Sequence, residues 1–339
     1  MTIVKSAVSI LVLSLAMVAS AGAQTFKQIE AAAKAEGKLV VYTSIQDAEM
    51  QVRVPAFEAA YPEIRVQYIR LPSSQIFSRF VGEKDAGVVK ADFLATGSTA
   101  LYQLRPELFV PLSSEKTPNL TSNIAVKAAN PNYLVFQVDT HVVTYNSNLV
   151  SDKDLATHLS TWEGLADPRW AGKIALVDPH TSTNQVSFML MLREKYGDEW
   201  YKRFVANRFE LVTTATAGAQ KVAAGAYHIV VPTIPAQSQA VRAQGAPVKL
   251  YQPGGIAHSP AQGMAVPLNS PNPNAALVFL NWMLSPKGQQ LTCDFGSAAV
   301  LPVASGDCAV KLPKEFMLGR DVIDKADQDK VFSLVGGKP

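Results

Sequence analysis

One stretch, residues 170–196, most narrowly limits how this chain can fold; it reads WAGKIALVDPHTSTNQVSFMLMLREKY. Residues 173–177 predict a buried strand, because all but Lys173 are apolar, and the following Asp-Pro-His should end it. An apolar helical stretch comes next, and the hydroxyl-rich tripeptide 181–183 lies where that helix should begin. This order of strand, polar turn and helix is typical of an α/β protein whose turns line a ligand crevice.

The start of this helix is a candidate ligand site built from Thr181, Ser182 and Thr183. The first N–H groups of a helix have no intrahelical partners, and the helix dipole is positive at this end. Free N–H groups and hydroxyls therefore suit an anion or the polar head of a ligand. The alternative is that Thr181 or Ser182 only caps the helix, and this segment by itself favours neither interpretation.

The same order of elements recurs at residues 38–44, 91–98, 213–218 and 227–233. In open parallel sheets, the loops at the carboxyl ends of the strands form the ligand crevice. Ordinary helix capping is the alternative at each of these turns. The candidate ligand-binding residues are Thr43, Ser44, Gly97, Ser98, Thr181, Ser182, Thr183, Thr216, Gly218 and Thr233.

The amino-terminal residues 1–23 predict a cleaved signal peptide and an exported, periplasmic protein. Lys5 is their single charge, residues 7–18 are mostly apolar, and Ala-Gly-Ala at 21–23 fits a cleavage site, so that Gln24 begins the mature chain. The alternative is an uncleaved membrane anchor. The apolar run is, however, shorter than the about 20 residues that a spanning helix needs.

Charge and cysteine content narrow the class of protein further. The chain has 17% charged residues and a formal net charge of +3, without runs of like charge, so we expect no nucleic-acid partner. Cys293 and Cys308 are the two cysteines. In an oxidising compartment they predict one disulfide, whereas in the cytosol they would stay reduced. No histidine lies near them, which disfavours a metal site.

Two β-rich runs and a helical segment complete the expected organisation. Residues 133–145 are expected to cross from one domain to another, and residues 257–266 to return. Residues 270–295 predict two helices, of which NAALVFLNWML is apolar nearly all round and belongs in a core. A mature chain of this length usually forms two domains.

Six stretches, in order, carry a resemblance to a known family: residues 37–44, 144–146, 162–165, 167–174, 223–226 and 275–289. They follow the predicted signal peptide and extend over nearly the whole mature chain. With this ordered set, the chain resembles the periplasmic solute-binding proteins of ABC importers. It is similar in particular to the two-lobed group that includes ferric-ion-, hexose-phosphate- and phosphonate-binding members.

The resemblance implies a type II periplasmic-binding-protein-like α/β fold, in which two lobes of sheet and helices are joined by crossover strands. Residues 24–140 would form the first part of lobe 1 and residues 141–256 lobe 2. Residues 257–339 would return to lobe 1 and add the C-terminal helices. The lobes would close on a small-molecule ligand, and the monomeric protein would deliver it to a permease and ATPase complex in the inner membrane.

The ligand expected from the residues is a small polar anion: a phosphate ester, a phosphonate, a carboxylate or an iron chelate. The adjacent tyrosines that ferric-binding relatives use do not occur in this sequence, which disfavours bare ferric ion. The five histidines show no metal-ligand spacing, so we expect neither a metal site nor a cofactor.

Two other classes of function are alternatives to solute transport. A ligand-binding subunit of a periplasmic sensory system would use the same lobe closure, so the sequence does not separate it from transport. A secreted hydrolase is disfavoured, because the sequence contains no G-x-S-x-G, P-loop, H-E-x-x-H or C-x-x-C motif. We therefore expect a binding protein rather than an enzyme.

Overall fold

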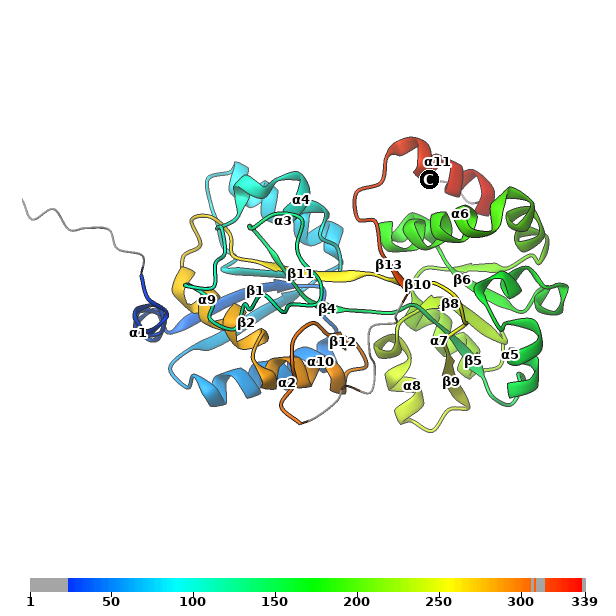
Figure 1. Cartoon of the computed structure of the whole chain (residues 1–339), viewed down its shortest axis with the longest axis horizontal. Coiled ribbons are helices and arrows are strands. Elements are labelled where there is room, and N and C mark those ends of the chain that lie inside the picture. Colours follow the sequence, from blue (N-terminus) through cyan, green and yellow to red (C-terminus); the bar gives the residue numbers. More distant parts are fainter. Residues whose placement is uncertain (1–23, 306–307, 309–314, 337–339) are drawn as a thin grey trace, which may run out of the picture.

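The computed structural model of the chain describes residues 24–305, 308 and 315–336. In these residues strands and helices alternate and form two lobes, which lie side by side (Figure 1). The predicted signal peptide, residues 1–23, lies outside the described residues. Of the described helices, none combines the length and the apolar character that a membrane span requires.

The first lobe is built on a six-stranded sheet with the order β12-β4-β11-β3-β1-β2. β1, β2 and β3 are parallel, whereas β11 runs antiparallel to β3 and β4. Its strands are β1 (Lys38–Thr43), β2 (Arg65–Arg70), β3 (Phe93–Thr96), β4 (Leu134–Val138), β11 (Ala261–Ala265) and β12 (Ala298–Ala299). Its helices are α1 (Phe26–Glu36), α2 (Asp47–Ala60), α3 (Ser73–Asp85), α4 (Ala100–Leu104), η1 (Pro106–Leu108), α9 (Pro273–Met283) and α10 (Pro286–Asp294).

The second lobe is built on a five-stranded sheet with the order β7-β6-β8-β5-β9. β6, β7 and β8 are parallel, and β5 pairs antiparallel with β8 and β9. Its strands are β5 (Val142–Asn146), β6 (Ile174–Val177), β7 (Glu210–Val212), β8 (Ile229–Thr233) and β9 (Val248–Tyr251). Its helices are α5 (Asp152–His158), η2 (Trp162–Ala166), η3 (Pro168–Trp170), η4 (Pro179–Thr181), α6 (Thr183–Ala206), α7 (Ala215–Ala223), η5 (Pro235–Ser238) and α8 (Gln239–Ala243).

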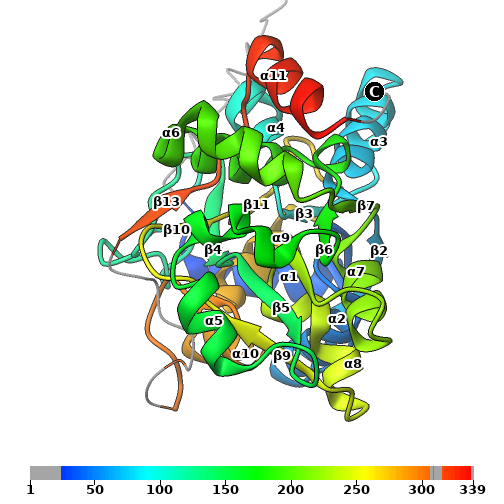
Figure 2. The ribbon, with the colours of Figure 1, turned by 90° about the vertical axis from the view of Figure 1, so that its right-hand side faces the viewer.

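Helices cover both faces of each sheet, as an α/β protein requires. In the first lobe α3 and α4 lie on one side and α2 and α10 on the other; in the second lobe α6 lies opposite α7 and α8 (Figures 1 and 2). α6 kinks at Gly197, where φ is 79°, so the helix has two parts. The expected α/β architecture with two sheets is therefore confirmed.

Each lobe has its own hydrophobic core. In α9, every residue from Ala275 to Met283 is buried, most of them in the core of the first lobe, as the all-round apolar sequence predicted. Trp162, Trp170 and Trp200 are buried in the core of the second lobe. Full burial of one large apolar side chain contributes about 1.5–3 kcal/mol, so each lobe holds its strand ends on a stable framework.

Two chain segments pass between the lobes side by side. Residues 139–141 join β4 to β5, and Pro260 joins β10 (Ala257–Ser259) to β11. Backbone hydrogen bonds tie the segments together: Asp139 N donates to Pro260 O at 2.9 Å, and His141 N donates to His258 O at 2.9 Å. These are the crossover strands that the β-rich runs predicted.

The C-terminal segment differs from the division expected from the sequence. β13 (Phe316–Leu318) pairs with β10 between the lobes, and α11 (Lys325–Val335), which the sequence analysis did not predict, packs against α6 (Figure 1). Val331 and Val335 are buried in the core of the second lobe. Residues 257–339 therefore do not all belong with the first lobe, because the apolar face of α11 is buried against the second. The limits at 140 and 256 stay a prediction.

The predicted disulfide is formed between Cys293 and Cys308, whose Cα atoms are 5.2 Å apart. Cys293 lies in α10 of the first lobe. The bond therefore ties the chain that follows β12 to this helix.

Asp139, the residue that follows β4, is a buried carboxylate at the crossing. Its side chain is 4% exposed. It accepts hydrogen bonds from Gln262 Nε2 at 2.7 Å and from Ser297 Oγ at 2.5 Å. Burial raises the pKa of Asp139 to about 6, although these hydrogen bonds act to lower it.

We expect this carboxyl group to make the protein less stable as the pH rises from about 4.5 to about 7.5. In the folded protein it keeps its proton up to about pH 6, but in the unfolded chain only up to about pH 4. The folded state therefore binds more protons in this window, and the free energy of unfolding falls with rising pH. The Asp139→Asn variant lacks the group, so its stability relative to the native protein should increase by about 2 kcal/mol across the window.

Urea unfolding of both proteins at the two pH values measures this change. Gln262 Oε1 has no partner, so a flipped Gln262 amide can accept from the amide introduced at position 139 and keep the packing intact. A stability difference between the two proteins that stays constant with pH would contradict the prediction.

Candidate functional site

The parallel strands of each lobe end toward the other lobe. A hydrogen bond from Asn184 Nδ2, in the first turn of α6, to Gly97 O, in the turn after β3, joins the two sides at 2.9 Å. On the side of the crossing, Pro235 of the second lobe lies against Gly296 of the first. The turns that follow the carboxyl ends of β1 and β3 therefore face those that follow β6 and β8, which is where α/β sheets bind ligands.

The first-lobe side of this candidate site is a cluster of small polar residues. Gly97 N donates to Ser44 Oγ at 2.8 Å, and Ser73 Oγ donates to the same oxygen at 3.2 Å. Ser98 follows and is 8% exposed. A side chain at position 97 would meet the Ser44 and Ser73 hydroxyls at 3.6 and 4.0 Å, so the turn brings its backbone close to both serines. The structure thus brings together Ser44, Gly97 and Ser98 in one cluster, and their contact with a ligand stays a prediction.

The second-lobe side is the start of α6. Ser182 is the N-cap, and its hydroxyl accepts from Asn184 N at 3.2 Å. Thr181 is exposed and donates through Oγ1 to Asp178 O at 2.7 Å. Thr183 is the first residue of α6, which is 24 residues long. The capping alternative therefore holds for Ser182, and the same residues lie at the helix end that meets the first lobe.

Three of the candidates lie inside the lobes and have structural contacts. Thr43 is 0% exposed, and its hydroxyl donates to Ala95 O and accepts from Ile45 N. Thr233 is also 0% exposed and bonds to Thr144 Oγ1 at 2.7 Å. Gly218 is buried against the sheet, where an added Cβ would lie 2.5 Å from Val230 Cγ2. These positions hold strands and helix together, because the hydroxyls of Thr43 and Thr233 bond within their lobes and Gly218 lets α7 approach the sheet closely.

The remaining candidate, Thr216, is exposed in the first turn of α7. The cap of that helix is Thr214, whose hydroxyl accepts from Ala217 N at 3.1 Å. Thr216 is therefore free of the capping role, and it lies on the helix that follows β7.

Three polar residues of the site were not among the candidates: Asn184, Gln185 and Asp321. The first two lie within the stretch from which the sequence analysis started, and their amides at a helix start were the available signal. No sequence pattern pointed to Asp321, which lies in the segment before α11. Its Oδ2 accepts from Thr99 N at 2.7 Å and from Thr99 Oγ1 at 2.5 Å. Burial raises the pKa of this carboxyl group.

Histidines and carboxylates do not form a metal centre in the part of the chain that the structure describes, where no group of three or more such side chains could hold an ion. His141 and His258 stack at the crossing, with their Nδ1 atoms 3.0 Å apart. Burial lowers the pKa of His141 well below its usual value and that of His258 to about 3. The pair is therefore neutral and joins the two crossing segments.

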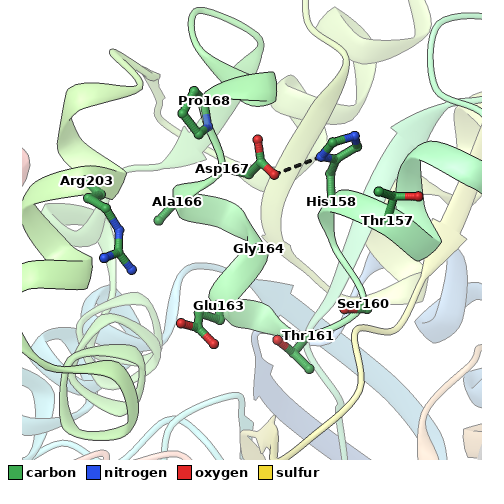
Figure 3. Close-up of a pocket in the computed structure, with 10 residues that line it drawn as sticks. All are labelled: Thr157, His158, Ser160, Thr161, Glu163, Gly164, Ala166, Asp167, Pro168 and Arg203. Atoms are coloured by element: carbon green, nitrogen blue, oxygen red, sulfur yellow. Dashed lines mark hydrogen bonds and ion pairs between the residues drawn. The ribbon is translucent and has the colours of Figure 1, made fainter.

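A separate hollow of about 370 Å³ lies on the second lobe alone (Figure 3). His158 Nδ1 and Asp167 Oδ2 form a pair at 2.8 Å on its wall. The hollow is lined by residues of α5, η2 and α6 among others, and α5 lies at the end of the second lobe that is farther from the first lobe (Figure 1). Its lining consists of Thr157, His158, Ser160, Thr161, Glu163, Gly164, Ala166, Asp167, Pro168 and Arg203. The polar turns between the lobes, which both halves of the chain supply, form the stronger candidate site.

Comparison with known proteins gives one family and many similar folds. The profile of the bacterial extracellular solute-binding proteins matches residues 53–307. The substrate binding protein of an ABC transporter from Agrobacterium tumefaciens is 19% identical, with a TM-score of 0.73 over 87% of this chain and 91% of that one. Iron-bound HitA from Pseudomonas aeruginosa is 19% identical, with a TM-score of 0.68 over 88% and 98%. AfuA from Actinobacillus pleuropneumoniae, solved with fructose-6-phosphate, is 19% identical, with a TM-score of 0.64 over 88% and 96%.

Proposed function

Because the chain belongs to the bacterial extracellular solute-binding protein family, we propose that it is the periplasmic binding component of an ABC importer. After removal of residues 1–23, the protein captures a small polar solute between its two lobes. It then delivers the solute to a permease and ATPase complex in the inner membrane. The observation that carries this proposal is the contact between Asn184 and Gly97, which sets the polar turns of the two lobes face to face.

The class of solute that we propose is an anion held by neutral donors. α3, α6 and α7 each begin in a turn that follows a parallel strand, at the ends of β2, β6 and β7. Helix N-termini carry free N–H groups and a partial positive charge, which favour phosphate and carboxylate groups. Arg70 is a charged residue at the end of β2, but its guanidinium group already donates to the turn after β1. It donates to Ile45 O at 3.1 Å and to Gln46 Oε1 at 2.9 Å.

Phosphate esters, phosphonates, carboxylates and iron chelates fit this description. The similar folds of AfuA with fructose-6-phosphate and of HitA with iron support the inclusion of sugar phosphates and of chelated iron. Bare ferric ion is disfavoured by the lack of a His, Cys, Asp and Glu group among the described residues and of adjacent tyrosines in the sequence.

Capture would proceed by hinge closure about the two crossing segments. A solute that binds to the turns of one lobe gains further hydrogen bonds from the other when the lobes close. The closed form is then favoured by its additional contacts with the solute. The crossing itself is short, with 139–141 and Pro260 as its residues, so a few backbone torsions can carry the motion.

A thermal-shift screen of the mature chain tests the proposed function. The panel contains hexose phosphates, phosphonates, phosphate, carboxylates, ferric citrate, polyamines and thiamine. A solute at about 100 times its dissociation constant should stabilise the protein by about 2.7 kcal/mol. An anionic hit supports the proposal; a hit with simple cations alone would overturn the anion class, and the lack of any binder would argue against solute capture.

For the solute found in this screen, we expect the double change Thr181→Val and Thr183→Val to weaken binding by about thirtyfold. Valine keeps the shape of threonine but removes the hydroxyl, which in Thr181 would turn from Asp178 O to the solute on binding. Each neutral hydrogen bond contributes about 1 kcal/mol net. Titration calorimetry measures the affinity. The matched control is Thr157→Val, which removes a hydroxyl from the hollow beside α5. If the control variant bound the solute more weakly and the double variant did not, the binding site would be assigned to the hollow.

A further inference from the structure

Asn184 Oδ1 and Asp321 Oδ1, two buried side-chain oxygens at the contact between the lobes, have no hydrogen-bond partner. Gln185, next to Asn184 in the first turn of α6, carries a third such oxygen, Oε1. Gln185 is 9% exposed and Asp321 is 7% exposed. Asn184 contacts Gly97 and Asp321 contacts Thr99, so both side chains approach the same short turn of the first lobe. Buried polar atoms in native proteins are nearly always paired, so this group of oxygens indicates a missing partner.

The neighbouring contacts hold two of these oxygens, those of Asn184 and Asp321, as acceptors. Asn184 Nδ2 donates to Gly97 O, and a flip of the amide would set its oxygen against that carbonyl. Asp321 Oδ2 accepts both the N–H and the hydroxyl of Thr99. The Ser98 hydroxyl lies beside the same carboxylate and acts to lower its pKa, but Oδ1 has no hydrogen-bond partner. The missing partner must therefore bring hydrogen-bond donors rather than acceptors.

The partner must also balance a charge. Among the residues that the structure describes, no cationic side chain forms a salt bridge with Asp321, and the adjacent Arg320 is directed to Glu194 at 2.8 Å. Buried carboxylates are as a rule paired with a cation. Asp321 has no such cation from the described part of the protein, and a solute between the lobes would supply it.

We propose that the solute carries an ammonium group beside its anionic group, and that Asp321, Asn184 and Gln185 bind this ammonium. An ammonium offers three N–H donors and one positive charge, which suits three free oxygens of which one belongs to a carboxylate. The anionic group then lies at the start of α6. This inference rests on the proposed function and narrows its solute to zwitterions, such as aminoalkyl phosphonates, amino acids and amino sugar phosphates.

Pairs of solutes that differ in this one group test the inference by titration calorimetry. The probes are 2-aminoethylphosphonate against propylphosphonate, β-alanine against butyrate, and glucosamine 6-phosphate against glucose 6-phosphate. We expect the amine of a bound pair to bind at least tenfold more tightly than its partner. Equal or tighter binding of the partner without the amine, or a screen whose binders all lack an amine, would overturn the inference while the proposed function stands.

A variant gives a second test, in which the melting temperature of the solute-free protein is one readout and the affinity for an amine-bearing solute is the other. Asp321→Asn removes an uncompensated buried charge, so the solute-free variant should melt at the same temperature as the native protein or higher. It should bind an amine-bearing solute at least tenfold more weakly. The control is Asp329→Asn, which neutralises a half-exposed carboxylate of α11 paired with Lys325 and should leave affinity unchanged. A clearly lower melting temperature for Asp321→Asn would assign the carboxylate a purely structural role and overturn the inference.

Discussion

Replacing Arg53 with alanine is expected to destabilise the protein by about 3–5 kcal/mol. Arg53 lies in α2 and is 0% exposed. It pairs with Glu49 at 2.6 Å and donates to Gly288 O at 3.0 Å and to Thr292 Oγ1 at 2.8 Å. These bonds join α2 to α10. The alanine variant would leave the Glu49 carboxylate buried without its cation, which costs far more than the loss of an exposed pair.

Urea unfolding monitored by circular dichroism measures this effect. The control is Lys325→Ala, which breaks a pair with the same spacing, Lys325 with Asp329, whose side chains are 85% and 56% exposed. Exposed pairs contribute about 0–1 kcal/mol. Removal of both buried charges, as Arg53→Met with Glu49→Leu, should recover much of the stability. A small loss for Arg53→Ala, similar to that of the control, would show that the buried pair is not required.

Replacing Gly288 with alanine is expected to destabilise the protein by at least about 3 kcal/mol, at the upper end of overpacking effects. Gly288 lies in α10, directly after α9. An added Cβ would lie 2.4 Å from Trp282 O and 2.6 Å from Met283 O. These are backbone atoms at the end of a helix whose residues are nearly all buried, so they cannot move aside. Any shift of α10 would also disturb the bond between Gly288 O and Arg53.

The matched control is Gly82→Ala, a second glycine in a helix. Gly82 lies in α3, is not buried in the core, and has no heavy atom within 4 Å of an added Cβ. Alanine is the better helix former, so this variant should gain about 0.5–1 kcal/mol. The two variants should therefore move the unfolding midpoint in opposite directions. A shift of the same sign in both would contradict the account of Gly288.

The candidate site was predictable where its signal is local. The turns at Ser44, Gly97 and Ser98 and the helix start at Ser182 follow from a strand, a polar turn and a helix in succession. The sequence could not tell which hydroxyls of these turns point inward. Thr43 and Ser44 are neighbours, yet Thr43 bonds within the sheet and Ser44 bonds to Gly97, because Thr43 is the last residue of β1 and Ser44 lies in the turn beyond it.

The sequence by itself determined the α/β class, most of the strands and helices, the crossing segments and the disulfide, because periodicity, turn residues and cysteine pairing are local or simple signals. Only the tertiary structure placed α11 on the second lobe and brought Asp321 to Thr99, a contact between residues 222 positions apart. Such contacts depend on how two lobes pack rather than on any pattern near Asp321. The same packing leaves the oxygens of Asn184, Gln185 and Asp321 without donors, and thereby defines the chemistry of the proposed solute.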